Sequence, residues 1–203
     1  MVYYFNQGGA FMWPILILLI IGVMISLERL ISLTLAGVNT RKFLTRVKEA
    51  LSSDGVSGAM EVCENTRGPV ASIFHAGLMR ADRGVDQVEK AISNAGSIEM
   101  AFLERGLIWL ATIIAIAPML GFTGTVVGMI QAFDAIKEAN NISPAVVAGG
   151  ISVALLTTAF GLIAAMIIQF FHNFFVARID KLIIDMEESS VELVDTLIDL
   201  EKK

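Results

Sequence analysis

Charged positions are distributed along this chain in blocks. Three blocks contain no Asp, Glu, Lys or Arg: residues 11–27, 106–133 and 145–177. At about 1.5 Å per residue, the second block would form a helix roughly 42 Å long and the third a helix of roughly 50 Å. A hydrocarbon core is about 30 Å thick, so both can cross a membrane with turns to spare, and the first block is near the lower length limit. The pattern predicts three transmembrane helices.

The segment between the first and second spans is polar and helical in pattern. Residues 28–105 hold ten basic and ten acidic side chains, and breaks at 52–58 and 66–69 divide them into short helices. Apolar residues recur at helical spacing within 82–105. This spacing predicts one amphipathic helix that feeds directly into the second span.

The tail, residues 178–203, continues the helical period of the third span. Its apolar positions follow heptad spacing and form a seam that requires a partner helix. The members of this seam are Val176, Ile179, Ile183, Met186, Ser190, Leu193, Leu197 and Leu200. The expected fold is therefore an all-α membrane protein with three transmembrane helices, the second and third long and extending into the cytoplasm, a helical cytoplasmic loop and a C-terminal helix.

Composition supports the membrane assignment. Of the 203 residues, 55% are hydrophobic and 17% are charged, whereas a soluble domain usually carries about 25% charged residues. The net charge of −5 argues against a nucleic-acid binder, so lipids and other membrane chains are the expected partners. Cys63, the single cysteine, cannot form an internal disulfide.

Basic side chains indicate the orientation. Fourteen of the 15 Lys and Arg fall in residues 28–105 or 178–203, and only Lys137 falls in the short turn expected at 134–144. Within 20 residues of each span the ratio is eight to one. Because basic residues beside membrane helices stay in the cytoplasm, the N-terminal residues 1–10 and the turn are expected on the opposite, periplasmic side.

The second and third spans each have a face of small residues with a threonine at mid-depth. In the second span, Gly121, Thr125 and Gly128 share one helical face. The corresponding face of the third span consists of Gly150, Ala154, Thr158, Gly161 and Ala165. Small residues let another helix approach closely, and a Thr hydroxyl can hydrogen-bond across the contact. Such a face taken alone is more often simple helix packing than a functional surface.

Catalytic and metal-binding chemistry lack their residues in this sequence. There is no nucleotide-binding P-loop, His172 is the only ionisable side chain in the third span, and His75 has no second ligand at metal-site spacing. We therefore expect no catalytic residue, no metal and no cofactor. The second and third spans offer the hydroxyls of Thr112, Thr123, Thr125, Ser152, Thr157 and Thr158 and the amides of Gln131, Gln169 and Asn173. If ions move along this protein, another chain supplies the titrating group.

Two motifs resemble the MotA/TolQ/ExbB proton-channel family, and the likeness is strongest to its ExbB and TolQ branch. APMLGFTGTVVGMIQAF in the second span is similar to the family's APxLGLLGTVxGMIxxF. GGISVALLTTAFGLIAA in the third span is similar to GIxxALxTTAxGLxxA. The expected three-span topology agrees as well, so the resemblance covers nearly the whole chain.

The resemblance implies a stator-type subunit of an inner-membrane motor that couples the proton-motive force to work in the periplasm or at the outer membrane. It implies a homo-oligomer, a pentamer, around a dimer of a single-span ExbD/TolR-like protein whose membrane Asp carries the transported proton. By position in the motifs, the proton path would be lined by Thr125, Thr157, Thr158 and Asn173. Helix packing and a kink would fall to Pro118, Gly121, Gly124, Gly128 and Gly161.

The chain departs from the family pattern at two places. Val153 stands where ExbB and TolQ proteins often have Glu, and Ile167 stands where they have proline. The first removes an acid from the third span, and the second predicts a straighter helix end. Two other classes stay open: a non-conducting helical scaffold and a subunit of a small-molecule transporter. The sequence leaves open the process that a motor would drive, and favours H⁺ over Na⁺ only by resemblance.

Overall fold

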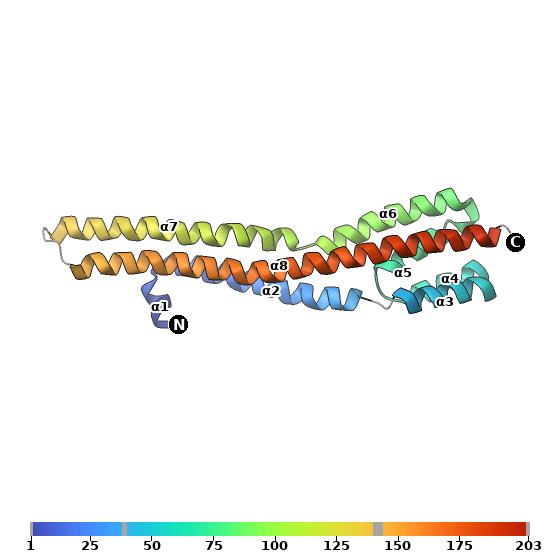
Figure 1. Cartoon of the computed structure of the whole chain (residues 1–203), viewed down its shortest axis with the longest axis horizontal. Helices are drawn as coiled ribbons and strands as arrows, with labels where there is room; N and C mark the ends of the chain where they lie inside the picture. Colours follow the sequence, from blue (N-terminus) through green and yellow to red (C-terminus); the bar gives the residue numbers. More distant parts are fainter. Residues whose placement is uncertain (1, 38–39, 140–143, 202–203) are drawn as a thin grey trace. The chain divides into compact units, whose positions relative to one another are not determined.

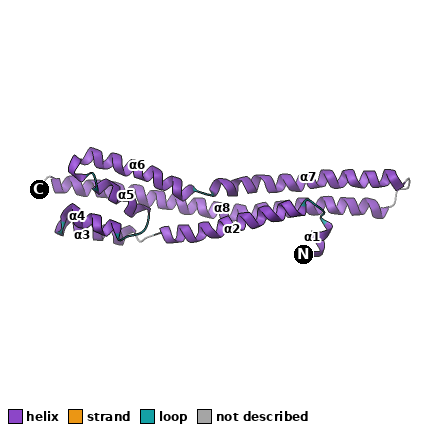
Figure 2. Cartoon of the chain, turned by 180° about the vertical axis from the view of Figure 1, so that it is seen from behind, coloured by secondary structure: helices purple, strands orange, loops and turns teal. Residues whose placement is uncertain are grey.

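The computed structural model describes residues 2–37, 40–139 and 144–201, and every regular element within them is helical (Figures 1 and 2). Three helices, α2, α7 and α8, are long and apolar enough to cross a membrane. The all-α fold and the three spans are therefore confirmed. The elements in chain order are α1 (Val2–Gln7), α2 (Met12–Ala36), α3 (Thr40–Ser53), α4 (Gly55–Glu64), α5 (Pro69–Leu78), the 3₁₀ helix η1 (Ala81–Arg83), α6 (Val85–Glu104), α7 (Leu107–Ala139) and α8 (Pro144–Glu201).

The chain divides into two compact units. Unit 1 comprises Met1–Arg29 and Gly106–Phe174, and unit 2 comprises Leu30–Arg105 and Phe175–Lys203. Helices α2 and α8 are continuous across the division, so each contributes residues to both units.

Unit 1 is a three-helix membrane unit made of α2, α7 and α8, which lie side by side in both views (Figures 1 and 2). Its core includes Ile15 of α2, Ala117 of α7, and Ala164 and Ala165 of α8. Small side chains at these positions bring the helices close together. Large apolar side chains such as Met119 of α7 point outward instead, as expected for a surface that faces lipid or another membrane helix.

Contacts at glycines give the directions of the three helices. An added Cβ on Gly22 would lie 2.7 Å from Ile168 Cδ1, and one on Gly9 would lie 3.4 Å from Val153 Cγ1. From the Gly9 contact to the Gly22 contact, the residue number increases in both partners, from 9 to 22 and from 153 to 168, so α2 and α8 run in the same direction. Across the α7–α8 contact the numbers run in opposite directions, because Gly161 lies against Ala117 while Gly150 lies against Ala132.

Unit 2 packs α3–α6 and the second half of α8 around an apolar core. The rings of Phe43 and Phe74 meet with centroids 5.4 Å apart, and Lys48 on α3 forms an ion pair with Glu192 on α8. Within the heptad seam of the tail, the fully buried positions are Ile179, Met186, Leu193 and Leu197. The partner that this seam requires is therefore supplied, at these positions, by the chain itself.

The amphipathic helix before the second span does not continue into it, contrary to the prediction. Helix α6 ends at Glu104, Gly106 has φ +88°, and α7 begins at Leu107. Glycine adopts this left-handed conformation without the steric cost that a Cβ brings. The expected start of the same helix at Asp82 is also too early, because Gly84, at φ +88°, separates η1 from α6.

Two of the long helices extend past the ends of their uncharged blocks. Helix α2 continues through Glu28 and Arg29 to Ala36. Helix α7 continues six residues beyond Phe133, into the segment expected as a polar turn. Of that turn, residues 140–143 lie outside the described residues, and α8 begins at Pro144, where proline's missing N–H has no helical partner to lose.

Candidate functional site

The contact between α7 and α8 is built on glycines that leave no room for a side chain. A Cβ added to Gly161 would lie 2.6 Å from the carbonyl oxygen of Ala117, and one on Gly121 would lie 2.9 Å from that of Thr157. One on Gly128 would lie 3.3 Å from Ala154 Cα. Because the neighbouring atoms are backbone, they cannot rotate away. The small faces of the two spans therefore meet each other within one chain.

Thr157 is enclosed in this contact. Its side chain is 1% exposed, and a Cβ added to Gly124 would lie 2.6 Å from its Oγ1. The hydroxyl is shared between two carbonyl oxygens of its own helix, those of Ala154 at 2.8 Å and Val153 at 3.2 Å. The structure thus places this predicted pore-lining residue between α7 and α8, away from any surface that a partner could reach.

Thr158 and Thr125 lie at the edge of the same contact and are half-buried. The Thr158 hydroxyl donates a hydrogen bond across the interface to the carbonyl oxygen of Gly121, at 3.0 Å. The Thr125 hydroxyl donates to the carbonyl oxygen of Phe122 in its own helix, at 2.6 Å. Each hydroxyl uses its O–H as a donor in these bonds, and its oxygen keeps lone pairs that can accept a hydrogen bond. Both can therefore accept a hydrogen bond from a protonated acid or a water molecule.

Asn173 lies well apart from the threonines. It is fifteen residues after Thr158 on α8, or about 22 Å along the helix axis. Its side chain is exposed, and its Oδ1 accepts a hydrogen bond from Gln169 Nε2 at 2.7 Å. A path that used Thr158 and Asn173 together would run along much of the length of the span.

Pro118 lies inside α7, which continues through it. Proline has no N–H, so the carbonyl four residues earlier loses its helical partner, which weakens the helix at this point. The preceding residue, Ala117, is fully buried and its carbonyl oxygen is the one that Gly161 approaches. The proline therefore lies directly beside one of the close approaches between α7 and α8.

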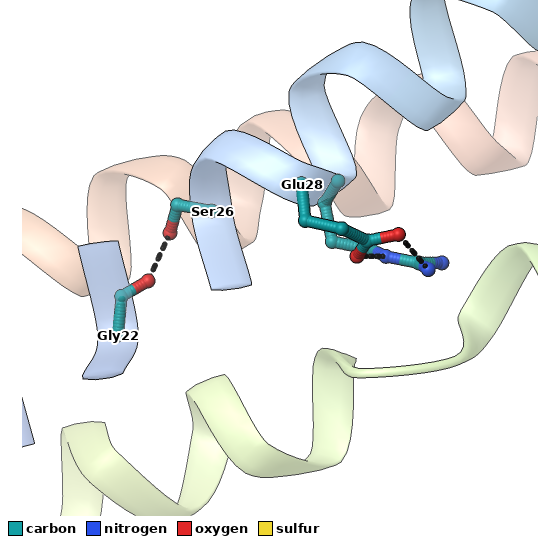
Figure 3. Close-up of polar contacts among 4 residues, drawn as sticks. Gly22, Ser26 and Glu28 are labelled. Atoms are coloured by element: carbon teal, nitrogen blue, oxygen red, sulfur yellow. Dashed lines mark hydrogen bonds and ion pairs between the residues drawn. The ribbon is translucent and has the colours of Figure 1, made fainter. Parts of the chain in front are cut away.

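A polar layer on α2 was missed by the sequence analysis. Ser26 is 2% exposed, and its hydroxyl donates to the carbonyl oxygen of Gly22 at 2.7 Å. Arg29 is 7% exposed and holds the Glu28 carboxylate through two bonds of 2.7 and 2.8 Å (Figure 3). In the sequence, Glu28 and Arg29 were interpreted only as the end of the first span. The signal for the layer was Ser26 itself, a lone hydroxyl in an otherwise apolar block.

No group of three or more His, Cys, Asp or Glu side chains that could hold a metal ion occurs among the described residues. In unit 2, His75 Nε2 lies 3.2 Å from Glu64 Oε1. Neighbouring Cys63 is buried, and burial, assisted by the charge of Glu64, raises the pKa of its thiol to about 12. Such a thiol is a poor nucleophile at neutral pH.

Comparison with known proteins bears directly on this arrangement. Residues 65–188, which include all of α7 and the part of α8 that faces it, match the MotA/TolQ/ExbB proton channel family. The chain belongs to this family. It is a family of membrane channel proteins and not of enzymes.

Relatives named ExbB and TolQ support the branch suggested by the motifs. A putative biopolymer transport protein ExbB homolog of Methanothermobacter thermautotrophicus is 34% identical over 94% of this chain and 66% of its own length. The putative ExbB-like protein 3 of Synechocystis is 27% identical over 83% of this chain and 81% of its own. The Tol-Pal system protein TolQ of Pseudomonas aeruginosa is 37% identical over 56% of this chain and 54% of its own. The chain thus spans about two thirds or less of two of these relatives.

Proposed function

We propose that this chain is a stator-type proton-channel subunit of an energy-transducing motor in the inner membrane. The proposal rests on one observation: this member of a proton-channel family has no acidic side chain in its second and third spans. The α7–α8 contact presents threonine hydroxyls at mid-membrane, and residues 106–133 and 145–177 contain no Asp or Glu. A proton path across the membrane needs an acid that titrates at mid-depth. That acid therefore comes from another chain.

The partner is an ExbD/TolR-like single-span protein, present as a dimer, whose membrane Asp carries H⁺. Thr125 and Thr158 flank Gly121, one along α7 and the other across the contact. Their free lone pairs accept a hydrogen bond from the protonated Asp or from water beside it. Thr157 has a different task, because its buried hydroxyl is already shared between two carbonyls; it holds α8 against Gly124.

The subunit works as a homo-oligomer, a pentamer, around that dimer. Exposed apolar side chains such as Phe122 and Phe170 cover the outward faces of α7 and α8, and these faces pack against neighbouring copies or lipid. The distribution of the basic residues supports a cytoplasmic unit 2 and a periplasmic N-terminus. Movement of the partner within the ring delivers work to the periplasm or the outer membrane.

Replacement of Thr158 by Val tests the proposal. Val keeps the shape of Thr but lacks the hydroxyl, so we expect the complex to assemble and its proton flux in liposomes to fall about tenfold or more. Thr112→Val is the matched control, since the Thr112 hydroxyl bonds only the carbonyl oxygen of Ile108, within α7. Normal flux in the assembled Thr158→Val complex would contradict the role of Thr158.

One observation favours a second candidate, a non-conducting scaffold. The glycines of both small faces are already used in contacts within the chain, which is what a purely structural membrane subunit requires. A scaffold predicts that the purified wild-type complex conducts no protons under an imposed pH gradient. The proton-channel proposal predicts flux that disappears when the partner's membrane Asp is replaced by Asn.

A further inference from the structure

His172 is a titratable side chain in an unusual position. It is the only ionisable residue between 145 and 177, and it lies on α8 within unit 1. Its ring is half-buried, and its Nδ1 atom is buried and has no hydrogen-bond partner among the described residues. A buried nitrogen without a partner costs free energy. A water molecule bound to Nδ1 would remove this cost, and Nδ1 is also an atom that can accept a proton.

Helix register brings His172 to the level of the polar layer of α2. Gly22 lies against Ile168, and α2 and α8 run in the same direction. One helical turn further along each helix come Ser26 and His172. Ser26 is almost fully buried, and its hydroxyl, which donates to Gly22, keeps lone pairs for a further bond. The buried serine of this layer is visible in Figure 3.

Charge in this layer is balanced. Glu28 and Arg29 form a two-bond ion pair on α2 (Figure 3). A Cβ added to Gly106, just before α7, would lie 3.6 Å from Arg29 Nε. The two side chains of the pair carry no net charge together. The first three turns of α7 carry no charged side chain. His172 differs from Glu28 and Arg29 in having two ring nitrogens, either of which can carry a proton.

An exposed pair of amides flanks His172 on its own helix. Gln169 and Asn173 are hydrogen-bonded to each other at 2.7 Å, and Asn173 is exposed. These residues stand three positions before and one position after the histidine. The imidazole therefore lies between a buried polar layer and a polar surface, as a group that passes protons from one to the other must.

Resting on the proposed function, we infer that His172 is a proton relay at the cytoplasmic end of the path. A proton that arrives at one ring nitrogen of the neutral imidazole gives the imidazolium. The other ring nitrogen then releases its proton to water beside Asn173, which leaves the opposite neutral tautomer. Rotation of the ring about its Cβ–Cγ bond then turns the protonated nitrogen toward the water and the bare nitrogen toward the interior, so that the next proton can enter. One proton enters, one leaves, and no bond to carbon is made or broken.

The test is proton flux through the complex purified by a tag on this chain and placed in liposomes. For His172→Ala we expect flux to fall about tenfold or more and imidazole added to the buffer to restore part of it. His75→Ala, which removes the other of the two histidines, is the matched control and keeps its flux. Rescue by imidazole separates a relay from a packing role, since a small base in solution does not repair helix packing.

The outcomes separate the two proposals. If the wild-type complex conducts protons and His172→Ala conducts equally well, the relay is wrong while the channel stands. Reduced flux that imidazole does not restore also overturns the relay and marks His172 as a packing residue. If the wild-type complex conducts no protons, the proposed function fails, and the relay fails with it.

A spectroscopic readout does not depend on flux. With ¹⁵N-labelled histidine and a His75→Gln substitution, each copy of this chain carries one labelled histidine, His172. We expect its nitrogen signals to show both neutral tautomers, because a relay passes through both. A single tautomer that is unchanged when a pH gradient is imposed would contradict the relay.

Discussion

Thr125 and Thr158 differ in what their hydroxyls already do. The Thr125 hydroxyl bonds a carbonyl of its own helix, so its loss leaves the α7–α8 contact intact. The Thr158 hydroxyl bonds Gly121 across the contact. Hydrogen bonds between membrane helices are worth on average about 0.6 kcal/mol. A Thr158→Val subunit is therefore expected to lose little stability, and a large loss of flux in it reports on proton transfer.

Cys63 provides a test of unit 2 at the residue scale. Burial raises the pKa of its thiol from 9.0 to about 12, so the thiolate fraction at neutral pH falls about a thousandfold, and the thiolate is the reactive form. We expect iodoacetamide to modify the folded chain at least about a thousand times more slowly than the urea-unfolded chain. Equal rates would show that Cys63 is not buried in unit 2.

Residue chemistry was readable from the sequence only in part. The pattern placed Thr125 and Thr158 on small faces, because helical spacing determines which residues share a face. It could not show that Thr157, the neighbour of Thr158, is buried against Gly124, because spacing does not show which helix a face contacts. Ser26 and the unpartnered nitrogen of His172 became visible only once α2 was placed beside α8.

At the scale of elements, the glycines of α7 and α8 set the distance between the two helices. At Gly161 an added Cβ would come within 2.6 Å of a backbone oxygen, whereas at Gly149 it would meet nothing within 4 Å. The two glycines lie on the same helix, so they form a matched pair for substitution.

We expect Gly161→Ala to destabilise unit 1 by about 1–3 kcal/mol, because the backbones must separate to admit the methyl group. Gly149→Ala should leave stability unchanged or raise it slightly, since Ala is the better helix former. Both tryptophans, Trp13 and Trp109, belong to unit 1, so thermal unfolding in detergent followed by tryptophan fluorescence reports on this contact. Equal midpoints for the two variants would show that α7 and α8 do not meet at Gly161.

Element boundaries followed from the sequence less well than element types. The three spans were predictable from the length of the uncharged blocks, and the amphipathic α6 from the spacing of its apolar residues. The break at Gly106 was not predictable. An apolar period continues through this residue, and the sequence does not show whether a glycine inside a helical pattern has a positive φ. The extension of α2 through Glu28 and Arg29 was missed for the opposite reason. Charges suggested an end, but neighbouring side chains of opposite sign can pair within a helix.

At the scale of the whole molecule, two units are joined by two continuous helices, of which α8 is 58 residues long. Its seam residues supply buried positions in unit 2, and its small face meets α7 in unit 1. The chain thus satisfies its own packing needs at both faces. What it does not contain is an Asp or Glu in the uncharged blocks 106–133 and 145–177. This lack, in a member of a proton channel family, is the basis of the functional proposal.

The central claim is that this chain forms the wall of a proton path whose acid belongs to another protein. The most direct test is the native mass of the detergent-solubilised complex, purified through a tag on this chain from its own host. We predict a pentamer of this chain with a dimer of a small single-span protein that carries an Asp in its membrane helix. Recovery of the chain alone, or with a partner that has no acid in the membrane, would contradict the claim and leave the scaffold as the better account.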